Sequence, residues 1–285
     1  MPARDRPNRR WARSGAAQPD QVARPDRPAP PGELRLSVVL PAFAEAATIA
    51  ETVARVRAAL TEVEGGVEVI VVDNGSPDAT TSEARAAGAD VVVTLPANRG
   101  KGAAVRAGVG AARGRTVAFT DADLAYAPEQ LVTVLETVEE GWDVVVGSSR
   151  HDATTTLVRA RRLREVGGRL INWFTHAVVL GQYRDTQCGL KAFRADAAAV
   201  LFEQSRIDGF AFDIELFVIA ERNSLALREV PVEVSNSSRS TVRVARHGAL
   251  LVRDLFRIGR WARRGAYRPA VTGAPATPGR SRPTR

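Results

Sequence analysis

The stretch Thr116–Asp123, with the sequence TVAFTDAD, decides the fold, because an apolar run leads directly into two carboxylates. The apolar residues predict a buried strand, and residues i and i+2 of a strand lie on the same face. Asp121 and Asp123 can therefore point at one spot beyond the strand's end. Two close carboxylates repel each other unless a cation lies between them, and hard oxygen ligands suit Mg²⁺ or Mn²⁺. The alternative is a solvated loop after a strand.

Similar apolar segments recur along the first half of the chain, at residues 36–40, 67–72, 91–93 and 144–147. Apolar residues with helical spacing fall between them, over residues 48–60 and about 101–113. We expect Pro41 to end the first strand. Strands that alternate with helices indicate an α/β fold with a doubly wound, mostly parallel sheet.

Polar clusters follow four of these strands, at residues 41–45, 73–78, 98–102 and 121–123. Ligands of such sheets bind beyond the carboxyl ends of the strands, so the clusters predict one site. No G-x-G-x-x-G follows the first strand, Gly108-Val109-Gly110 lies inside a predicted helix, and a P-loop is absent. The nucleotide site is therefore expected to be of another type, in which a metal holds the phosphates.

Five motifs carry a resemblance to a known family: VLPAFAE at 39–45, VVDNGS at 71–76, NRGKG at 98–102, DAD at 121–123 and GSSR at 147–150. Together they resemble the inverting family 2 glycosyltransferases of the GT-A fold. The second half is similar to dolichyl-phosphate glucosyltransferases and their bacterial polyprenyl-phosphate relatives. That similarity rests on RDTQCGLKAF at 184–193, FDIE at 212–215 and EVPV at 229–232.

The resemblance implies a site for a nucleotide sugar and a divalent cation. Uracil and ribose would contact Pro41, Ala42, Glu45 and Asp73. Lys101 and Gly102 would border the base or the phosphates. Asp121 and Asp123 would hold Mg²⁺ or Mn²⁺ on the diphosphate, and Ala122 between them would belong to the nucleotide site. The sequence departs from the family at Ala44, where Asn is usual, and at Asn74, where a second Asp is common.

The implied reaction transfers a hexose, most simply glucose from UDP-glucose, to a polyprenyl or dolichyl phosphate. Arg150 follows the fifth strand beside the donor site and is assigned to the reacting centre. The acceptor phosphate is expected to contact Arg162, Gln187, Lys191, Arg239 and Arg243. The sequence does not decide whether the donor nucleotide is UDP or GDP, or whether the transferred sugar is glucose, mannose or an N-acetylhexosamine.

Two basic amphipathic segments are expected in the acceptor half. One runs from Leu157 to Leu180. In the other, Leu251, Leu255, Ile258 and Ala262 form an apolar stripe opposite a stripe of arginines. Such helices commonly contact an anionic membrane surface, and this interpretation is favoured here. The alternative is a helix packed on the sheet with a solvated arginine face.

Asp213 and Glu215 are expected early in a helix, where acids favour the helix dipole. In family members that act on hydroxyl groups, an acid in this region is the general base. A phosphate acceptor is already anionic, so Asp213 can orient the site without removing a proton.

Three other functions compete with the lipid transferase. The first is transfer to a soluble or saccharide hydroxyl, with Asp213 as base. The second is a nucleotidyltransferase, which needs a glycine-rich basic loop that residues 41–45 lack. The third is a non-catalytic binding module, which would tolerate loss of the intact D-x-D.

Composition indicates one domain over residues 34–264, with a nucleotide-sugar half at 34–150 and an acceptor half at 151–264. Residues 1–33 carry +3 and residues 265–285 carry +4 of the net charge of +8, which leaves +1 for the domain. Both ends are expected to be disordered basic tails, and the domain is not expected to bind nucleic acid. The sequence does not indicate an oligomeric state.

Cys188 is the single cysteine, so no internal disulfide can form and a reducing compartment is indicated. No apolar run approaches the roughly 20 residues of a membrane-spanning helix. We therefore expect a cytoplasmic protein bound peripherally to the inner face of the cytoplasmic membrane.

Overall fold

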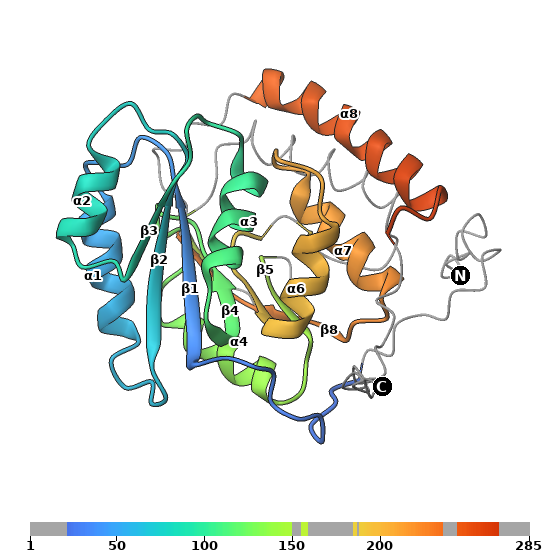
Figure 1. Cartoon of the computed structure of the whole chain (residues 1–285), viewed down its shortest axis with the longest axis horizontal. Helices are drawn as coiled ribbons and strands as arrows, with labels where there is room; N and C mark the ends of the chain where they lie inside the picture. The colour runs from blue at the N-terminus through green and yellow to red at the C-terminus, as the bar shows by residue number, and fades with distance from the viewer. Residues whose placement is uncertain (1–21, 150–154, 159–184, 187, 236–243, 268–285) are drawn as a thin grey trace, which may run out of the picture.

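A seven-stranded sheet forms the centre of the molecule (Figure 1). The computed structural model describes residues 22–149, 155–158, 185–186, 188–235 and 244–267. The sheet order is β3-β2-β1-β4-β7-β5-β8. Its strands are β1 Leu34–Ala42, β2 Val67–Asp73, β3 Val91–Thr94, β4 Gly114–Phe119, β5 Val144–Ser148, β7 Lys191–Arg194 and β8 Leu227–Pro231. All pairings are parallel except those of β7, which runs antiparallel to β4 and β5.

Helices cover both faces of this sheet, which confirms the expected α/β architecture. In Figure 1, α3 and α6 lie in front of the sheet, α4 lies behind it, and α8 crosses above the carboxyl ends of the parallel strands. The helices are α1 Ile49–Ala59, α2 Thr80–Ala86, α3 Lys101–Ala111, α4 Gln130–Glu139, α6 Ala195–Gln204, α7 Phe212–Arg222 and α8 Val244–Arg263. Among the described residues, no helix is both long and apolar enough to cross a bilayer.

β1 continues through Pro41 to Ala42, so the expectation that Pro41 ends the strand is wrong. The carbonyl of Val39 accepts from Thr120 on the β4 side, whereas the carbonyl of Ala42 accepts from Asn74 on the β2 side. The backbone groups of successive residues point to alternate sides of a strand, so the nitrogen of Pro41, which carries no hydrogen, points toward β4. The pairing of β1 with β4 has already ended at Val39 and Phe119, so no hydrogen bond is needed there. The proline therefore removes no hydrogen bond from the sheet.

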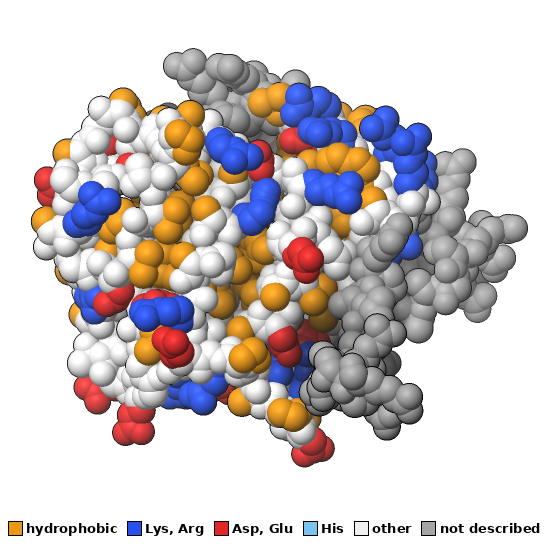
Figure 2. Space-filling view, in the orientation of Figure 1, with side chains coloured by type: hydrophobic (Ala, Val, Ile, Leu, Met, Phe, Trp, Pro, Cys, Tyr) orange, Lys and Arg blue, Asp and Glu red, His pale blue; other side chains and the backbone are white. Residues whose placement is uncertain are grey.

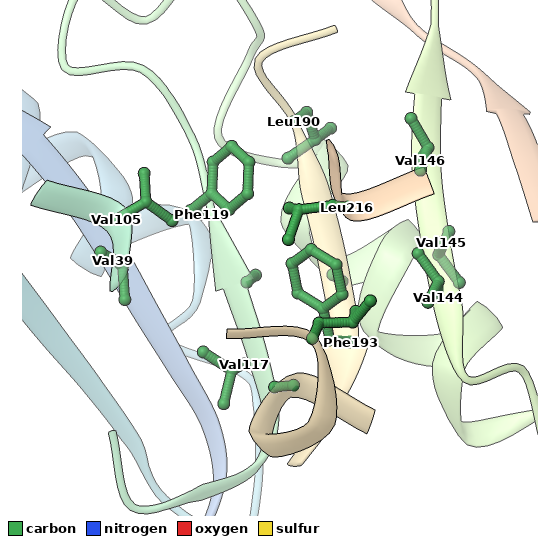
Figure 3. Close-up of a cluster of buried hydrophobic side chains, with 14 of the residues drawn as sticks. Val39, Val105, Val117, Phe119, Val144, Val145, Val146, Leu190, Phe193 and Leu216 are labelled. Atoms are coloured by element: carbon green, nitrogen blue, oxygen red, sulfur yellow. The ribbon is translucent and has the colours of Figure 1, made fainter. Parts of the chain in front are cut away.

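β7 joins the two halves of the chain at the centre of the core. Phe119 of β4 and Phe193 of β7 stack with ring centroids 6.0 Å apart, and Phe212 of α7 lies 5.9 Å from Phe119. Figure 3 shows these strands with β5, whose Val144, Val145 and Val146 are nearly or fully buried. The nucleotide-sugar half and the acceptor half thus share one sheet and one core.

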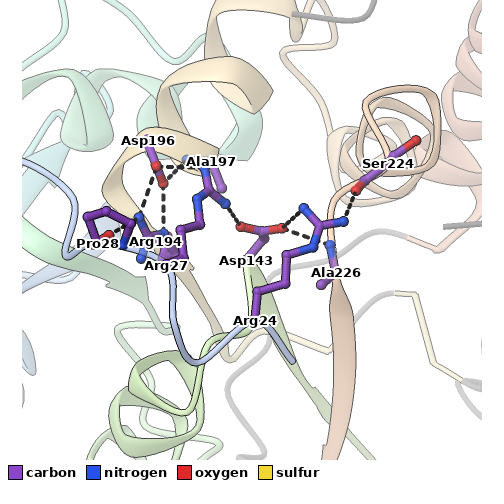
Figure 4. Close-up of polar contacts among 9 residues, drawn as sticks. All are labelled: Arg24, Arg27, Pro28, Asp143, Arg194, Asp196, Ala197, Ser224 and Ala226. Carbon is purple, nitrogen blue, oxygen red and sulfur yellow. Dashed lines mark hydrogen bonds and ion pairs between the residues drawn. The ribbon is translucent and has the colours of Figure 1, made fainter. Parts of the chain in front are cut away.

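The segment before β1 packs on the body, which corrects the expectation of a disordered tail up to residue 33. Arg27 forms ion pairs with Asp143 and Asp196, and Arg24 lies 3.8 Å from Asp143 (Figure 4). Asp143 is fully buried and also accepts from the N–H of Ala226 at 2.9 Å. Residues 24–28 are therefore fixed by a buried carboxylate, a contact that composition alone does not reveal.

The acceptor half begins with a strand instead of the expected helix at Leu157. Residues Thr155–Val158 form β6, which pairs in parallel with β9, Glu233–Ser235. The rest of the expected helix, residues 159–180, falls outside the described residues.

Candidate active site

A pocket of about 910 Å³ lies at the carboxyl ends of the parallel strands. The loop after β1 contributes one wall, the start of α3 and Asp121 a second, and the loop before α7 together with α8 the third. The sequence-predicted residues that line it are Pro41, Ala42, Glu45, Lys101 and Asp121. Residues that the sequence did not single out as ligands complete it: Phe43, Asn74, Asn98, Arg99, Arg206, Asp208, Phe210, Leu250, Arg253, Asp254 and Arg257.

Asp121 is paired with Lys101 across the second wall. The ammonium of Lys101 lies 2.5 Å from Oδ1 of Asp121 and 5.8 Å from the ring centroid of Phe119. Burial would lower the pKa of Lys101, but the charges of Asp121, Asp213 and Asp123 raise it above its usual value. Lys101 is therefore a permanent cation beside the first carboxylate of the D-x-D.

The two carboxylates of the D-x-D fit a divalent cation. Asp121 is partly exposed and Asp123 is exposed, with one Asp123 oxygen accepting from the N–H of Ala125 at 3.1 Å. A Cβ at Gly189 would lie 2.1 Å from Oδ2 of Asp121, so any larger residue at position 189 would displace this oxygen. Within the described residues no three acids, histidines or cysteines cluster as a complete metal site. A cation here would take its other ligands from the substrate diphosphate and water.

Beneath the pocket, Lys191 and Asp213 form a buried ion pair. The ammonium of Lys191 lies 2.6 Å from Asp213 and donates to the carbonyl of Cys188 at 2.7 Å. Burial raises the pKa of Asp213, and Lys191 and Lys101 oppose that shift. The expected acceptor contact of Lys191 does not fit this position, because its ammonium is enclosed and already bonded.

The loop after β2 is organised by Asp73. This carboxylate accepts from the N–H of Ser76 at 2.9 Å and from the hydroxyl of Thr81. Asn74, rather than Asp73, lines the pocket, and its amide joins this loop to the next by bonds to Asn98 and the N–H of Arg99. Asp73 thus shapes the wall that was expected to hold the ribose.

The buried carboxylate of Glu215 holds the loop before α7. One oxygen accepts from the hydroxyl of Ser205 and the N–H groups of Arg206 and Ile207, and the other accepts from the hydroxyl of Tyr267 at 2.7 Å. Burial and the charge of Glu215 raise the pKa of that tyrosine. Glu215 therefore fixes both the pocket wall at 205–207 and the chain that follows α8.

Glycine at two positions lets this loop approach α3. A Cβ at Gly100, where φ is 105°, would lie 2.4 Å from the carbonyl oxygen of Asp208. A Cβ at Gly102 would lie 2.5 Å from the carbonyl oxygen of Ile207. Gly102, predicted to border the nucleotide, therefore packs against the loop before α7 and does not line the pocket. Ala122 does not line the pocket either, because its side chain is buried.

The apolar stripe of α8 is buried in the protein and does not face a membrane, so the helix packs on the body as the alternative interpretation expected. The stripe members Leu251, Leu255, Ile258 and Ala262 are between 0 % and 7 % exposed. The remaining predicted ligands, Arg150, Arg162, Gln187, Arg239 and Arg243, lie outside the described residues.

A doubly wound sheet with a D-x-D after β4, whose first aspartate lines a pocket together with a lysine, is the arrangement of a GT-A glycosyltransferase. The chain belongs to glycosyltransferase family 2, whose profile, described as "Glycosyl transferase family 2", matches residues 37–202. It is therefore a hexosyltransferase, as the sequence motifs indicated.

Named relatives act on lipid phosphates. The chain is 35 % identical to the dolichyl-phosphate beta-glucosyltransferase of Drosophila melanogaster, over 83 % of this chain and 78 % of that protein. It is 32 % identical to the undecaprenyl-phosphate 4-deoxy-4-formamido-L-arabinose transferase of Aeromonas hydrophila, over 72 % of this chain and 60 % of that protein.

A solved structure is also similar. Glucosyl-3-phosphoglycerate synthase from Mycobacterium tuberculosis, in complex with Mn²⁺, UDP-glucose and phosphoglyceric acid, aligns with a TM-score of 0.62 and 26 % identity. The alignment covers 80 % of each chain.

Proposed function

We propose that this protein transfers glucose from UDP-glucose to a polyprenyl phosphate, with inversion at the anomeric carbon. The observation that carries the proposal is the pocket in which Pro41, Glu45, Lys101 and Asp121 meet. The substrates are inferred from the relatives: the Drosophila melanogaster protein is a dolichyl-phosphate glucosyltransferase, and the Mycobacterium tuberculosis structure holds UDP-glucose.

We assign Asp121 and Asp123 as the ligands of Mg²⁺ or Mn²⁺. Structures of the Mycobacterium tuberculosis synthase contain Mn²⁺ or Mg²⁺ together with UDP, which supports this assignment. A bound ion would neutralise charge that develops on the departing diphosphate. Lys101, which is cationic and lines the same wall, adds a second positive charge there.

Asp213 is assigned a positioning role in this reaction. Its side chain is 5 % exposed and is paired with Lys191, so it does not face an incoming acceptor. A phosphate oxygen is already a nucleophile at neutral pH, because the second phosphate pKa is about 6. The transfer therefore needs a positioned acceptor more than it needs a base.

A second candidate function is transfer to a soluble hydroxyl acceptor. It is favoured by the structural similarity to a synthase whose complex contains phosphoglyceric acid. In that reaction a base is required, and the buried pairing of Asp213 with Lys191 weighs against this residue.

The site of action proposed here is the membrane surface, at the inner face of the cytoplasmic membrane. The reason is the acceptor: a polyprenyl phosphate presents its head group at the bilayer surface. Contacts of this acceptor with Arg150, Arg162, Gln187, Arg239 and Arg243 remain predictions.

The test is a transfer assay with the full-length protein and Mg²⁺ or Mn²⁺. UDP-glucose, GDP-mannose and UDP-N-acetylglucosamine, each labelled in the sugar, are offered with undecaprenyl phosphate, dolichyl phosphate or phosphoglyceric acid. We expect label from UDP-glucose in the lipid extract. Label that appears only in phosphoglyceric acid would replace the proposal with the second candidate.

A further inference from the structure

We propose that Arg253 and Arg257 of α8 bind the phosphate of the lipid acceptor, at the wall of the pocket opposite Asp121. This inference rests on the proposed function and extends it, because neither arginine belongs to the motifs that identify the family. Both side chains line the pocket that also contains Lys101 and Asp121. In Figure 2, Lys and Arg side chains gather around α8, with hydrophobic side chains between them.

The position of α8 over the pocket is fixed by packing and by a buried hydrogen bond. Leu255 and Ile258 are fully buried on its inner face. Tyr267, just beyond its end, donates to Glu215 of α7, which also holds the loop at 205–207. The arginines of α8 are therefore presented to the pocket by a rigid element, as a binding site requires.

Excess positive charge remains on this wall after its internal pairs are counted. Arg253 and Arg257 share one carboxylate, Asp254, at 3.1 Å and 3.4 Å. Arg206 lines the same wall, and the nearby Asp208 is already paired with Arg99 and Arg106. Three guanidinium groups against Asp254 leave two positive charges, which matches a phosphate of about −2.

An aromatic side chain holds two of these guanidinium groups. Arg257 lies 4.9 Å and Arg206 lies 5.6 Å from the ring centroid of Trp261. Stacking and the Asp254 bonds limit the rotation of Arg257, so less entropy is lost when it binds a phosphate. Its side chain is nonetheless 45 % exposed and can reach a ligand.

The rim of the pocket favours a phosphate that is attached to a hydrocarbon. Phe43, Phe210 and Leu250 line the pocket and are 40 %, 38 % and 41 % exposed. They come from three separate elements, the loop after β1, the loop before α7, and α8. Uracil can stack on Phe43, which adjoins Pro41 and Ala42, whereas Phe210 and Leu250 offer an apolar surface that suits the first isoprene units of a polyprenyl phosphate.

The test compares Arg253→Ala, Arg257→Ala and Arg257→Lys with Arg260→Ala, an exposed arginine of the same helix that does not line the pocket. KM is measured separately for undecaprenyl phosphate and for UDP-glucose. We expect the two alanine variants to raise KM for the lipid at least tenfold and to change KM for UDP-glucose less than twofold. Arg260→Ala is expected to match the wild type in both constants.

Binding is also measured without turnover, from quenching of tryptophan fluorescence by undecaprenyl phosphate in detergent micelles. The wild type is expected to bind, and Arg253→Ala/Arg257→Ala to bind at least tenfold more weakly. Arg257→Lys keeps the charge beside Asp254, so its melting temperature and its lipid KM separate a folding defect from a binding defect. An equal rise in both KM values, or unchanged lipid binding, would overturn the inference. A wild type that binds the lipid but transfers no glucose to it would overturn the proposed function alone.

Discussion

Asp123 offers the most direct test of the metal assignment, because its carboxylate is exposed and is not part of the hydrophobic core. We predict that Asp123→Ala lowers kcat for glucose transfer at least a hundredfold, since one electrostatic stabiliser of a developing charge is worth about 3 kcal/mol. The variant should melt within about 2 °C of the wild type, as expected for a surface change.

EDTA should reproduce this loss in the wild type, and added Mn²⁺ or Mg²⁺ should reverse it. Full activity in EDTA would remove the cation from the reaction. Glu62→Ala is the matched control, because Glu62 is an exposed acid in the loop before β2 that does not line the pocket.

Cys188 is predicted to be inert in the folded protein. Burial raises the pKa of its thiol to about 12, and the residue is 1 % exposed. Because the thiolate is the reactive form, iodoacetamide at pH 8 should label the native protein at least a hundredfold more slowly than the protein in urea. Rapid labelling of the native protein would show that the β5–β7 region opens.

The pocket could be predicted from sequence where a polar cluster follows a strand, since parallel strands bring their carboxyl ends together. Pro41, Glu45, Lys101 and Asp121 belong to such clusters and line the pocket, whereas the ligand roles expected of Pro41, Glu45 and Lys101 came from the family resemblance. Arg253 and Arg257 could not be placed, because their position depends on which face of α8 packs against the body. The helical periodicity gave the buried stripe correctly but does not say whether protein or membrane covers it.

Among the elements, the segment before β1 is the one whose packing on the body could not be predicted from sequence composition. The five residues that contact the body, Arg24 to Pro28, show no apolar periodicity in their sequence. They are held by polar bonds to Asp143, Asp196 and Arg194. β1, β2, β4 and β5 were predictable as apolar β-branched runs. β7 was not, because four residues carry too little pattern and their pairing depends on β4 and β5.

Deleting residues 1–33 is predicted to destabilise the protein, whereas deleting residues 1–21 is not. Loss of Arg24 and Arg27 leaves the buried Asp143 without its cations, at a cost of about 2 kcal/mol because both arginines are partly exposed. The melting temperature should fall by roughly 4–8 °C in the longer deletion. Arg27→Ala should account for most of that fall; equal melting of both deletions would mean that the segment contributes nothing.

Two glycines of α3 are predicted to respond in opposite directions to alanine. Gly102→Ala places a Cβ 2.5 Å from a backbone oxygen and 2.7 Å from Cβ of Phe212, so it should destabilise by about 1–3 kcal/mol. Gly110→Ala meets nothing within 4 Å and should stabilise the helix by up to about 1 kcal/mol.

Urea unfolding measures both changes. Gly102→Ala should also raise KM for UDP-glucose, because it displaces the loop at 205–210 that lines the pocket. A stable and fully active Gly102→Ala variant would show that the loop adapts.

For the whole molecule, donor binding is predicted to stabilise the fold, because the pocket is built from elements of both halves of the chain. UDP with Mn²⁺ at 100 times its Kd should add about 2.7 kcal/mol, which corresponds to a rise in melting temperature of roughly 5–10 °C. UDP with EDTA should give a smaller rise, and GDP with Mn²⁺ almost none. Equal rises for UDP and GDP would contradict a uracil-specific pocket.

The insertion of β7 between β4 and β5 has a consequence for synthesis on the ribosome. β4 and β5 have left the ribosome before residues 191–194 are made. By then β4 can pair with β1 on one side only, and β5 has no partner, because its neighbours β7 and β8 both come later in the chain. A nascent chain that stops near residue 150 therefore leaves one edge of β4 and both edges of β5 unpaired, and unpaired strand edges are sites for aggregation. The nucleotide-sugar half is thus not a fragment that can be produced by itself. Chaperone demand should be greatest while translation covers the stretch from β5 to β7.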